Sequence, residues 1–206
     1  ADRDNLLVPE SPELGGFGYP IGGALFNLDT LKFYESLLAL NKSGLLAQYR
    51  TEPVQKKVIM EIGAGWGGFA YQFKTLCPGV TYIIIDLPQT LLFSAVYLMT
   101  LFPSASMFIY GDQAEDCLSE TCHSYDFVFL PHYYIDRLQL SRLDLAMNMV
   151  SFQEMTTEQV RQYVRRTYEL GCSNFYSLNR DRSPHNRQLT AVSSALSEYY
   201  SISPVP

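Results

Sequence analysis

The sequence predicts an α/β fold in which helices flank a mostly parallel sheet, and three observations predict it. A buried strand at Val58–Ile62 runs into a glycine turn and then into a helical pattern. The next strand, Thr81–Asp86, is apolar without alternation, which is typical of a strand covered on both faces. Strand and helix patterns then alternate along the chain, as the crossovers of a parallel sheet require.

Composition excludes several classes of protein. The 206 residues are 47% hydrophobic and 17% charged, which indicates a globular chain long enough for one domain with a substantial core. The net charge is -6 without a block of Lys or Arg, so we expect no nucleic-acid partner. No apolar run reaches the roughly 18–20 residues of a membrane span. The 4 cysteines lack C-x-x-C spacing and no signal peptide is visible, so we expect reduced thiols in a cytoplasmic protein.

The chain divides into two predicted regions. Residues 1–54 begin with a Gly- and Pro-rich stretch and continue into a helix that Asp29 or Thr30 can cap, so we expect a cap or lid. Residues 55–206 are expected to form the sheet domain. The further elements expected are helices at 69–76, 87–101, 156–170 and 188–199, and strands at 107–110, 125–130, 143–148, 174–178 and 200–205.

The glycine turn indicates a nucleotide-type cofactor. Gly63, Gly65 and Gly68 fit G-x-G-x-x-G, where the backbone turns tightly and leaves room for a ligand. Asp86 follows at the end of the second strand, where a carboxylate can accept hydrogen bonds from both ribose hydroxyls. NAD and S-adenosylmethionine both carry that ribose, so Asp86 does not separate the two cofactors.

Glu61, two residues before the first glycine, is the better discriminator. A dinucleotide places a diphosphate near the turn, which a carboxylate repels. S-adenosylmethionine carries a sulfonium and an ammonium, which a carboxylate attracts, the more so when water is excluded. The alternative interpretation is that Glu61 only accepts hydrogen bonds from backbone N–H groups.

These motifs resemble a known family. Glu61-Ile-Gly-Ala-Gly-Trp-Gly-Gly68 resembles motif I of the class I S-adenosylmethionine-dependent methyltransferases, and Tyr82–Pro88 resembles their second motif. More narrowly, Asn148–Met155, Phe175–Arg180 and the opening with Glu10-Ser11 are similar to the sugar O-methyltransferase family. The resemblance covers nearly the whole chain and implies a Rossmann-like class I methyltransferase fold.

The resemblance also implies how the cofactor is held. Its methionine part is expected on the glycine turn, and its ribose on Asp86. Two segments compete for the adenine: Gly111-Asp112, which we favour, and Pro131-His132 from an inserted strand, a departure from the family's minimal strand order. The last strand of the family fold has no counterpart before Pro206, so a longer chain is expected. The cofactor residues expected are Glu61, Gly63, Ala64, Gly65, Gly67, Asp86, Leu87, Asp112 and Asn148.

Methyl transfer to a sugar hydroxyl needs a base, and three residues are candidates. His132 follows a strand end directly, His185 lies in the loop after a strand, and Glu154 lies where the methyl end of the cofactor is expected. Each has a plainer interpretation, as a structural contact, a surface residue or a helix cap. Ser151, Asn179 and Arg180 are the candidate substrate contacts. Asp144 starts its strand and should point away from this site, so we expect no metal.

We therefore expect an S-adenosylmethionine-dependent enzyme that methylates a hydroxyl of a sugar or sugar-containing small molecule, with a homodimer as the assembly considered. One alternative is an NAD-binding oxidoreductase, although Tyr71 and Lys74 have the wrong spacing for a Tyr-x-x-x-Lys pair. Another is a methyltransferase-like module that binds the cofactor without catalysis.

Overall fold

The computed structural model describes residues 2–51, 56–111, 118–189 and 191–205. Its centre is a parallel six-stranded sheet with the order β5-β6-β4-β3-β7-β8. This confirms the predicted α/β class. The strands are β3 (Lys57–Ile62), β4 (Val80–Asp86), β5 (Met107–Ile109), β6 (Phe127–Pro131), β7 (Leu145–Met149) and β8 (Phe175–Leu178).

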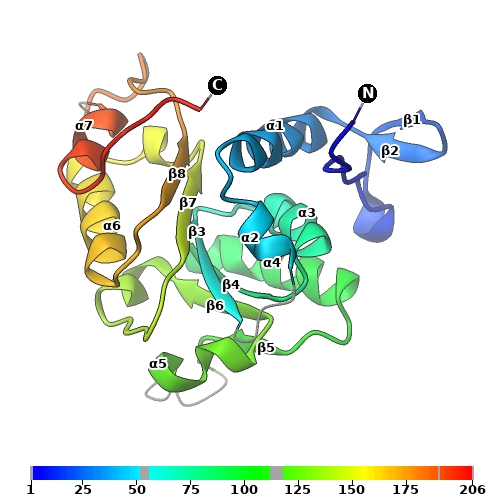
Figure 1. The fold of residues 1–206 in the computed structure, drawn as a ribbon, viewed down its shortest axis with the longest axis horizontal. Helices are drawn as coiled ribbons and strands as arrows, with labels where there is room; N and C mark the ends of the chain where they lie inside the picture. The colour runs from blue at the N-terminus through cyan, green and yellow to red at the C-terminus, as the bar shows by residue number, and fades with distance from the viewer. Residues whose placement is uncertain (1, 52–55, 112–117, 190, 206) are drawn as a thin grey trace.

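Helices cover both faces of the sheet (Figure 1). One face carries α1 (Leu28–Lys42), α3 (Gly68–Leu76) and α4 (Pro88–Leu101). The other carries α5 (Leu118–Thr121), α6 (Thr157–Glu169) and α7 (Val192–Ser197). A short helix, α2 (Ala47–Arg50), leads from α1 toward β3. Among the described residues, no helix combines the length and the apolarity needed to cross a bilayer.

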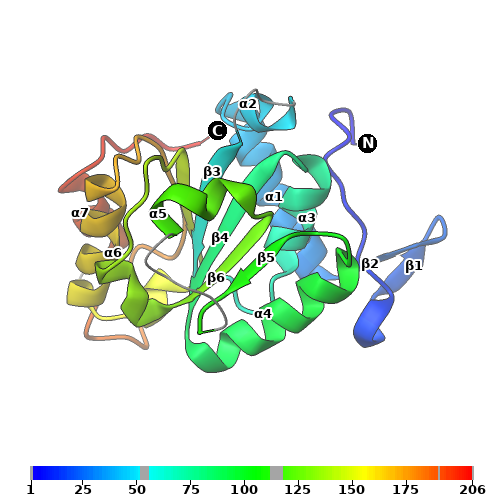
Figure 2. The same cartoon turned by 90° about the horizontal axis from the view of Figure 1, so that it is seen from below.

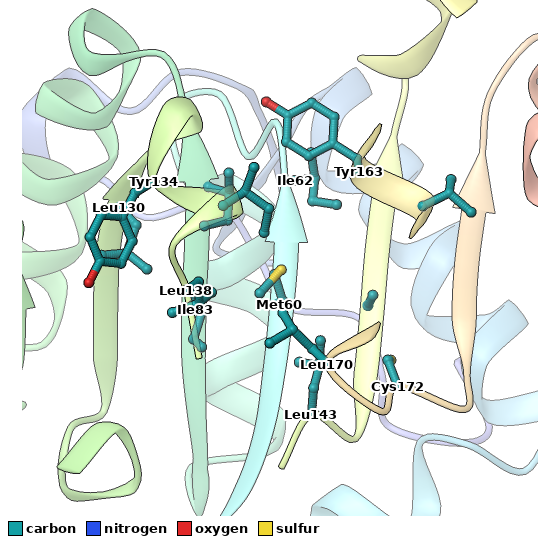
Figure 3. Packing of buried hydrophobic residues seen from close by; sticks show 14 of the residues in the cluster. Met60, Ile62, Ile83, Leu130, Tyr134, Leu138, Leu143, Tyr163, Leu170 and Cys172 are labelled. Atoms are coloured by element: carbon teal, nitrogen blue, oxygen red, sulfur yellow. The ribbon is translucent and has the colours of Figure 1, made fainter. Parts of the chain in front are cut away.

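Alternation along β3 divides the core into two layers. Val58, Met60 and Ile62 pack on the side of α6 and α7, where Figure 3 shows Met60 and Ile62 among the buried side chains of that layer. Ile59 points to the opposite layer, with α1, α3 and α4. Glu61 follows at the same alternation, so its carboxyl group enters the α1 side of the sheet.

A hairpin of β1 (Tyr19–Ile21) and β2 (Ala24–Phe26) projects from the body beside α1 (Figures 1 and 2). The buried carboxylate of Glu10 joins this region to the sheet domain. It accepts hydrogen bonds from the amide of Asn27 at 3.1 Å and from the hydroxyl of Tyr97 in α4 at 3.3 Å.

Several predicted boundaries needed correction. Helix α1 is capped by Asn27, whose side chain accepts from Thr30 N–H, so Thr30 belongs to the first turn and neither Asp29 nor Thr30 is the cap. Of the described residues in the predicted helix at 188–199, Val192–Ser197 are helical. The predicted strand at 200–205 is wrong over the described residues 200–205, which pair with no strand. The helix predicted at 156–170 is confirmed as α6, which is capped by the side chain of Thr156.

The sheet order settles which strand lies beside β4. Strand β6 pairs with β4, with Asp86 opposite Pro131, and β5 lies outside β6 at the edge. His132 therefore follows the strand next to Asp86. Asp112, which follows β5, lies outside the described residues.

Candidate functional site

A cavity of about 250 Å³ lies at the carboxyl end of β3, between the glycine turn, helix α1 and the ends of β7 and β8. Chain order reverses here, since β4 lies on one side of β3 and β7 on the other, and open parallel sheets bind ligands at such a point. The lining residues are Asp29, Lys32, Phe33, Ser36, Glu61, Gly63, Ala64, Gly65, Trp66, Met149, Val150 and Leu178.

Gly63 and Gly65 have different surroundings in the turn, although both have positive φ, +75° and +60°. A Cβ on Gly63 would lie 2.6 Å from Cβ of Ser151 and closer still to its Oγ, so this glycine allows the β7 turn to pack against the β3 turn. A Cβ on Gly65 would meet nothing within 4 Å. The backbone of Gly65 is therefore the part of the turn left open to a ligand.

Gly67 and Gly68 face protein. A Cβ on Gly67 would meet Ser94 at 3.2 Å, because the start of α3 packs on α4. At Gly68, the first residue of α3, a Cβ would lie 2.6 Å from the ring of Phe33 and closer to the ring of Trp66. These two rings, which also line the cavity, cover the amino-terminal end of α3.

Asp86 is tied to the glycine turn. One carboxylate oxygen accepts from Gly65 N–H at 2.8 Å and the other from Leu87 N–H at 2.7 Å. Burial raises the pKa of Asp86, against the lowering effect of those two hydrogen bonds and of nearby His132. A carboxylate offers about four lone-pair positions, so two hydrogen bonds leave acceptor capacity for a ligand.

Glu61 forms the buried floor of the cavity at 2% exposure. Its carboxyl accepts a hydrogen bond from the hydroxyl of Tyr82 at 2.8 Å, so the backbone-only interpretation does not describe it. Burial raises the pKa of Glu61 to about 8, while that of Tyr82 is held well above its ordinary value by burial and by Glu61. Burial therefore favours the neutral form of Glu61 over the carboxylate, which weakens the fixed negative charge expected from the sequence.

Asn148 lies behind the turn at 0% exposure, away from the cavity. Its amide donates to Ile62 C=O at 2.8 Å and to the hydroxyl of Ser151 at 2.5 Å, and its oxygen accepts from Phe152 N–H at 3.1 Å and from Asn179 at 2.9 Å. Asn148 and Ser151 therefore join the ends of β3 and β7. Both act through the backbone that they hold.

Val150 directly follows β7 and lines the cavity with φ +68°. A β-branched residue in the left-handed region is strained, and such strain persists only where the surrounding contacts impose it. Here Val150 N–H donates to Leu178 C=O at 2.8 Å, and the hydrogen-bonded network of Asn148 and Ser151 fixes the residues on either side. The strained turn places a valine side chain on the cavity wall.

None of the three candidate bases lines this cavity. His132 is half-buried at the end of β6 and close enough to Asp86 to influence its charge; among the described residues, its Nδ1 has no hydrogen-bond partner. Glu154 and His185 are exposed. Arg180 is also exposed, whereas Asn179 belongs to the Asn148 network.

The sequence reasoning missed the contribution of α1. Asp29, Lys32, Phe33 and Ser36 follow the spacing i, i+3, i+4, i+7, so they form one stripe of the helix, and that stripe faces the cavity. The spacing was visible in the sequence. However, only one of these four residues, Phe33, is apolar, so the stripe lacks the apolar periodicity that predicts a buried helix face. Asp144, by contrast, lies before β7 at the opposite end of the sheet, as predicted, where Arg142 and Lys57 pair with it.

Comparisons with known proteins assign the chain to no family. No family model matches the sequence, and neither does any curated protein. Among solved structures, the mitomycin 7-O-methyltransferase MmcR is 11% identical over 76% of this chain and 39% of that chain, with a TM-score of 0.41. Human N-acetylserotonin methyltransferase in complex with SAM is 14% identical over 69% and 34%, with a TM-score of 0.37.

An O-methyltransferase family protein from Burkholderia thailandensis is 13% identical over 69% of this chain and 37% of that chain, with a TM-score of 0.39. The chain thus spans 34–39% of the length of these three proteins. At such identities and TM-scores, the chemistry of this chain has to be inferred from its own residues.

Proposed function

We propose that the chain binds S-adenosylmethionine and directs transfer of its methyl group to a hydroxyl of a sugar or sugar-containing small molecule. The observation that carries the proposal is the junction of Gly65 and Asp86. Gly65 leaves open space above its backbone, and its N–H fixes a carboxylate that retains acceptor capacity. A ribose lying over this junction can donate both of its hydroxyls to Asp86.

The rings over α3 favour this cofactor over a dinucleotide. A diphosphate in a dinucleotide-binding fold lies on the amino-terminal end of the first helix, where free N–H groups and the helix dipole attract it. Here Phe33 and Trp66 pack over Gly68 at that end. A thioether or sulfonium chain needs no anion site, so the covered helix end is compatible with S-adenosylmethionine and unfavourable for NAD.

Glu61 also favours S-adenosylmethionine over NAD, through a change of its pKa on binding and not through a fixed charge. Its ionisation is opposed by burial, so a nearby ligand cation stabilises the charged form and lowers the pKa, whereas an anion raises the pKa further. Binding of a cationic methyl donor should therefore release a proton near neutral pH. A dinucleotide should not release one from this group.

For the adenine we infer the end of β6, since Pro131 lies opposite Asp86 and His132 follows it. This replaces the earlier preference for Asp112, because β5 lies one strand further out. The buried Nδ1 of His132 then has a polar ligand available to it.

When bound, S-adenosylmethionine would supply an activated methyl group on its sulfonium for transfer to the acceptor hydroxyl oxygen. The protein contributes alignment: the glycine turn and Asp86 hold the donor, while Met149, Val150 and Leu178 form the wall toward the acceptor. The sugar class is supported by the sequence resemblance.

Calorimetric titration tests the cofactor. S-adenosylhomocysteine should bind and NADH should not, and the opposite result would reject the proposal in favour of the oxidoreductase. Asp86→Ala should weaken S-adenosylhomocysteine binding by roughly 1–3 kcal/mol, the scale of hydrogen bonds to a charged group. Asp136→Ala, which removes an exposed carboxylate near α6, is the matched control and should leave the affinity unchanged.

Turnover tests the reaction. A panel of sugars incubated with the methyl donor should yield a product heavier by one methylene, detected by mass spectrometry. Donor binding without any methylated product would favour the non-catalytic module. At saturating donor, His132→Ala, Glu154→Ala and His185→Ala should be compared, since loss of a general base slows a reaction by about 10²–10⁴-fold.

A further inference from the structure

Helix α1 brings opposite charges to the mouth of the cavity. Asp29 and Lys32 pair across one turn at 3.2 Å, with side chains 37% and 49% exposed. Both line the cavity whose floor is the buried carboxyl of Glu61. One cation and two acids therefore surround a single small space.

The space between these groups is small and mostly apolar. Ala64, Met149 and Leu178 contribute to its walls, and its volume of about 250 Å³ is below the 300–1,000 Å³ typical of pockets that hold whole ligands. A full nucleoside cofactor therefore occupies it only in part. The part inside needs an apolar stem and a polar end.

The charged groups of Asp29, Lys32 and Glu61 determine which polar end of a ligand fits this space. A purely anionic group would meet two acids, and a purely cationic group would meet Lys32. A zwitterion, with an ammonium and a carboxylate on neighbouring bonds, satisfies both signs at once.

We propose that α1 holds the amino-acid end of S-adenosylmethionine, with Lys32 binding its carboxylate and with Asp29 and Glu61 binding its ammonium. This inference rests on the proposed function and adds a helix that precedes the first strand of the sheet to the donor site. The stripe Asp29, Lys32, Phe33 and Ser36 faces the glycine turn along one side of α1, so the amino-acid end lies between helix and turn. Phe33 covers the amino-terminal end of α3 in the same stretch.

Without the ligand, Asp29 and Lys32 pair with each other instead of with its two charged groups. An exposed pair one turn apart on a helix is weak and screened by salt, so a zwitterion can separate it with little loss. Binding replaces one ion pair by two, one for each charge of the ligand.

Two ligands and two matched variants test this. S-adenosylhomocysteine carries the amino-acid end, and 5′-methylthioadenosine shares its adenosine and thioether but lacks that end. Lys32→Met should weaken S-adenosylhomocysteine about tenfold or more and 5′-methylthioadenosine less than about twofold, as expected for one charged hydrogen bond. Lys42→Met makes the same change in an exposed residue of α1 away from the cavity and should alter neither affinity.

Lys32→Arg should retain most of the affinity for S-adenosylhomocysteine, and melting temperatures of all variants establish that they are folded. Equal weakening of both ligands by Lys32→Met, or no weakening of either, overturns the α1 assignment while leaving the methyl-donor proposal intact. Wild-type protein that binds 5′-methylthioadenosine as tightly as S-adenosylhomocysteine also overturns it. Wild-type protein that binds neither ligand overturns the proposed function itself.

Discussion

Replacing Gly63 by alanine should destabilise the protein through two separable effects. The residue has φ +75°, and a left-handed conformation costs an L-residue about 1–2 kcal/mol. The added Cβ would also lie 2.6 Å from Cβ of Ser151, and overpacking of this kind costs about 1–3 kcal/mol. Because the hydroxyl of Ser151 is held by Asn148 at 2.5 Å, it cannot swing away freely. Together these effects predict a loss of roughly 2–5 kcal/mol.

Urea unfolding without ligand measures this loss, and Gly65→Ala is the matched control. Gly65 has φ +60° but nothing within 4 Å of a Cβ, so its substitution should cost only the backbone part, about 1–2 kcal/mol. The double variant Gly63→Ala/Ser151→Gly tests the clash directly. It should show a favourable coupling of about 1–3 kcal/mol relative to the two single variants.

Two outcomes would refute this reasoning. If Gly63→Ala and Gly65→Ala lower the free energy of unfolding equally, Ser151 is not the limiting contact. If the double variant shows no coupling, the turns after β3 and β7 do not pack as described.

Two further predictions concern stability. Burial raises the pKa of Glu61 from 4.5 to about 8, so between these pH values the folded protein keeps a proton that the unfolded chain loses. The free energy of unfolding should therefore fall as pH rises from 4.5 to about 8. In Glu61→Gln, the difference in free energy of unfolding between about pH 5 and about pH 8, measured by urea titration, should be smaller by a few kcal/mol. An equal slope in both proteins would contradict the burial of an ionisable group. Lys74, 4% exposed, donates to Pro78 C=O, Val80 C=O and Asp126, so Lys74→Met should cost roughly 3–5 kcal/mol in the same assay. Lys56→Met removes the more exposed partner of the same Asp126 oxygen and should cost under about 1 kcal/mol; similar losses would show that burial of Lys74 is unimportant.

The sequence predicted the parts of the site that depend on local chemistry. The strand, turn and helix at 57–76 follow from an apolar run, glycines and helical spacing, and the position of Asp86 at a strand end follows from the next run. Contacts across the sheet were not predictable. The order of β5 and β6 depends on which crossover packs better, and the hydrogen bond from Tyr82 to Glu61 depends on the register of two strands.

Other features of the site could not be predicted because residue type alone indicated a different role or conformation. Glu154 and His185 have suitable chemistry and stand near strand ends, but both are exposed in the structure. Val150 favours extended backbone by type, so its positive φ could not be anticipated from the sequence. Lys32 and Asp29 resemble an ordinary surface pair until the fold places their helix over the glycine turn.

The pairing of β3 with β7 has a consequence for the order of folding. Strand β3 pairs with β4 across a short crossover, whereas its pairing with β7 joins residues 59–62 to 145–148 and closes a far longer loop. The cavity lies across the β3–β7 pairing, with the glycine turn on one side and Met149 and Val150 on the other. A nascent or partly denatured chain can therefore assemble the β5-β6-β4-β3 half and still lack the cavity, which is complete only once β7 has paired with β3.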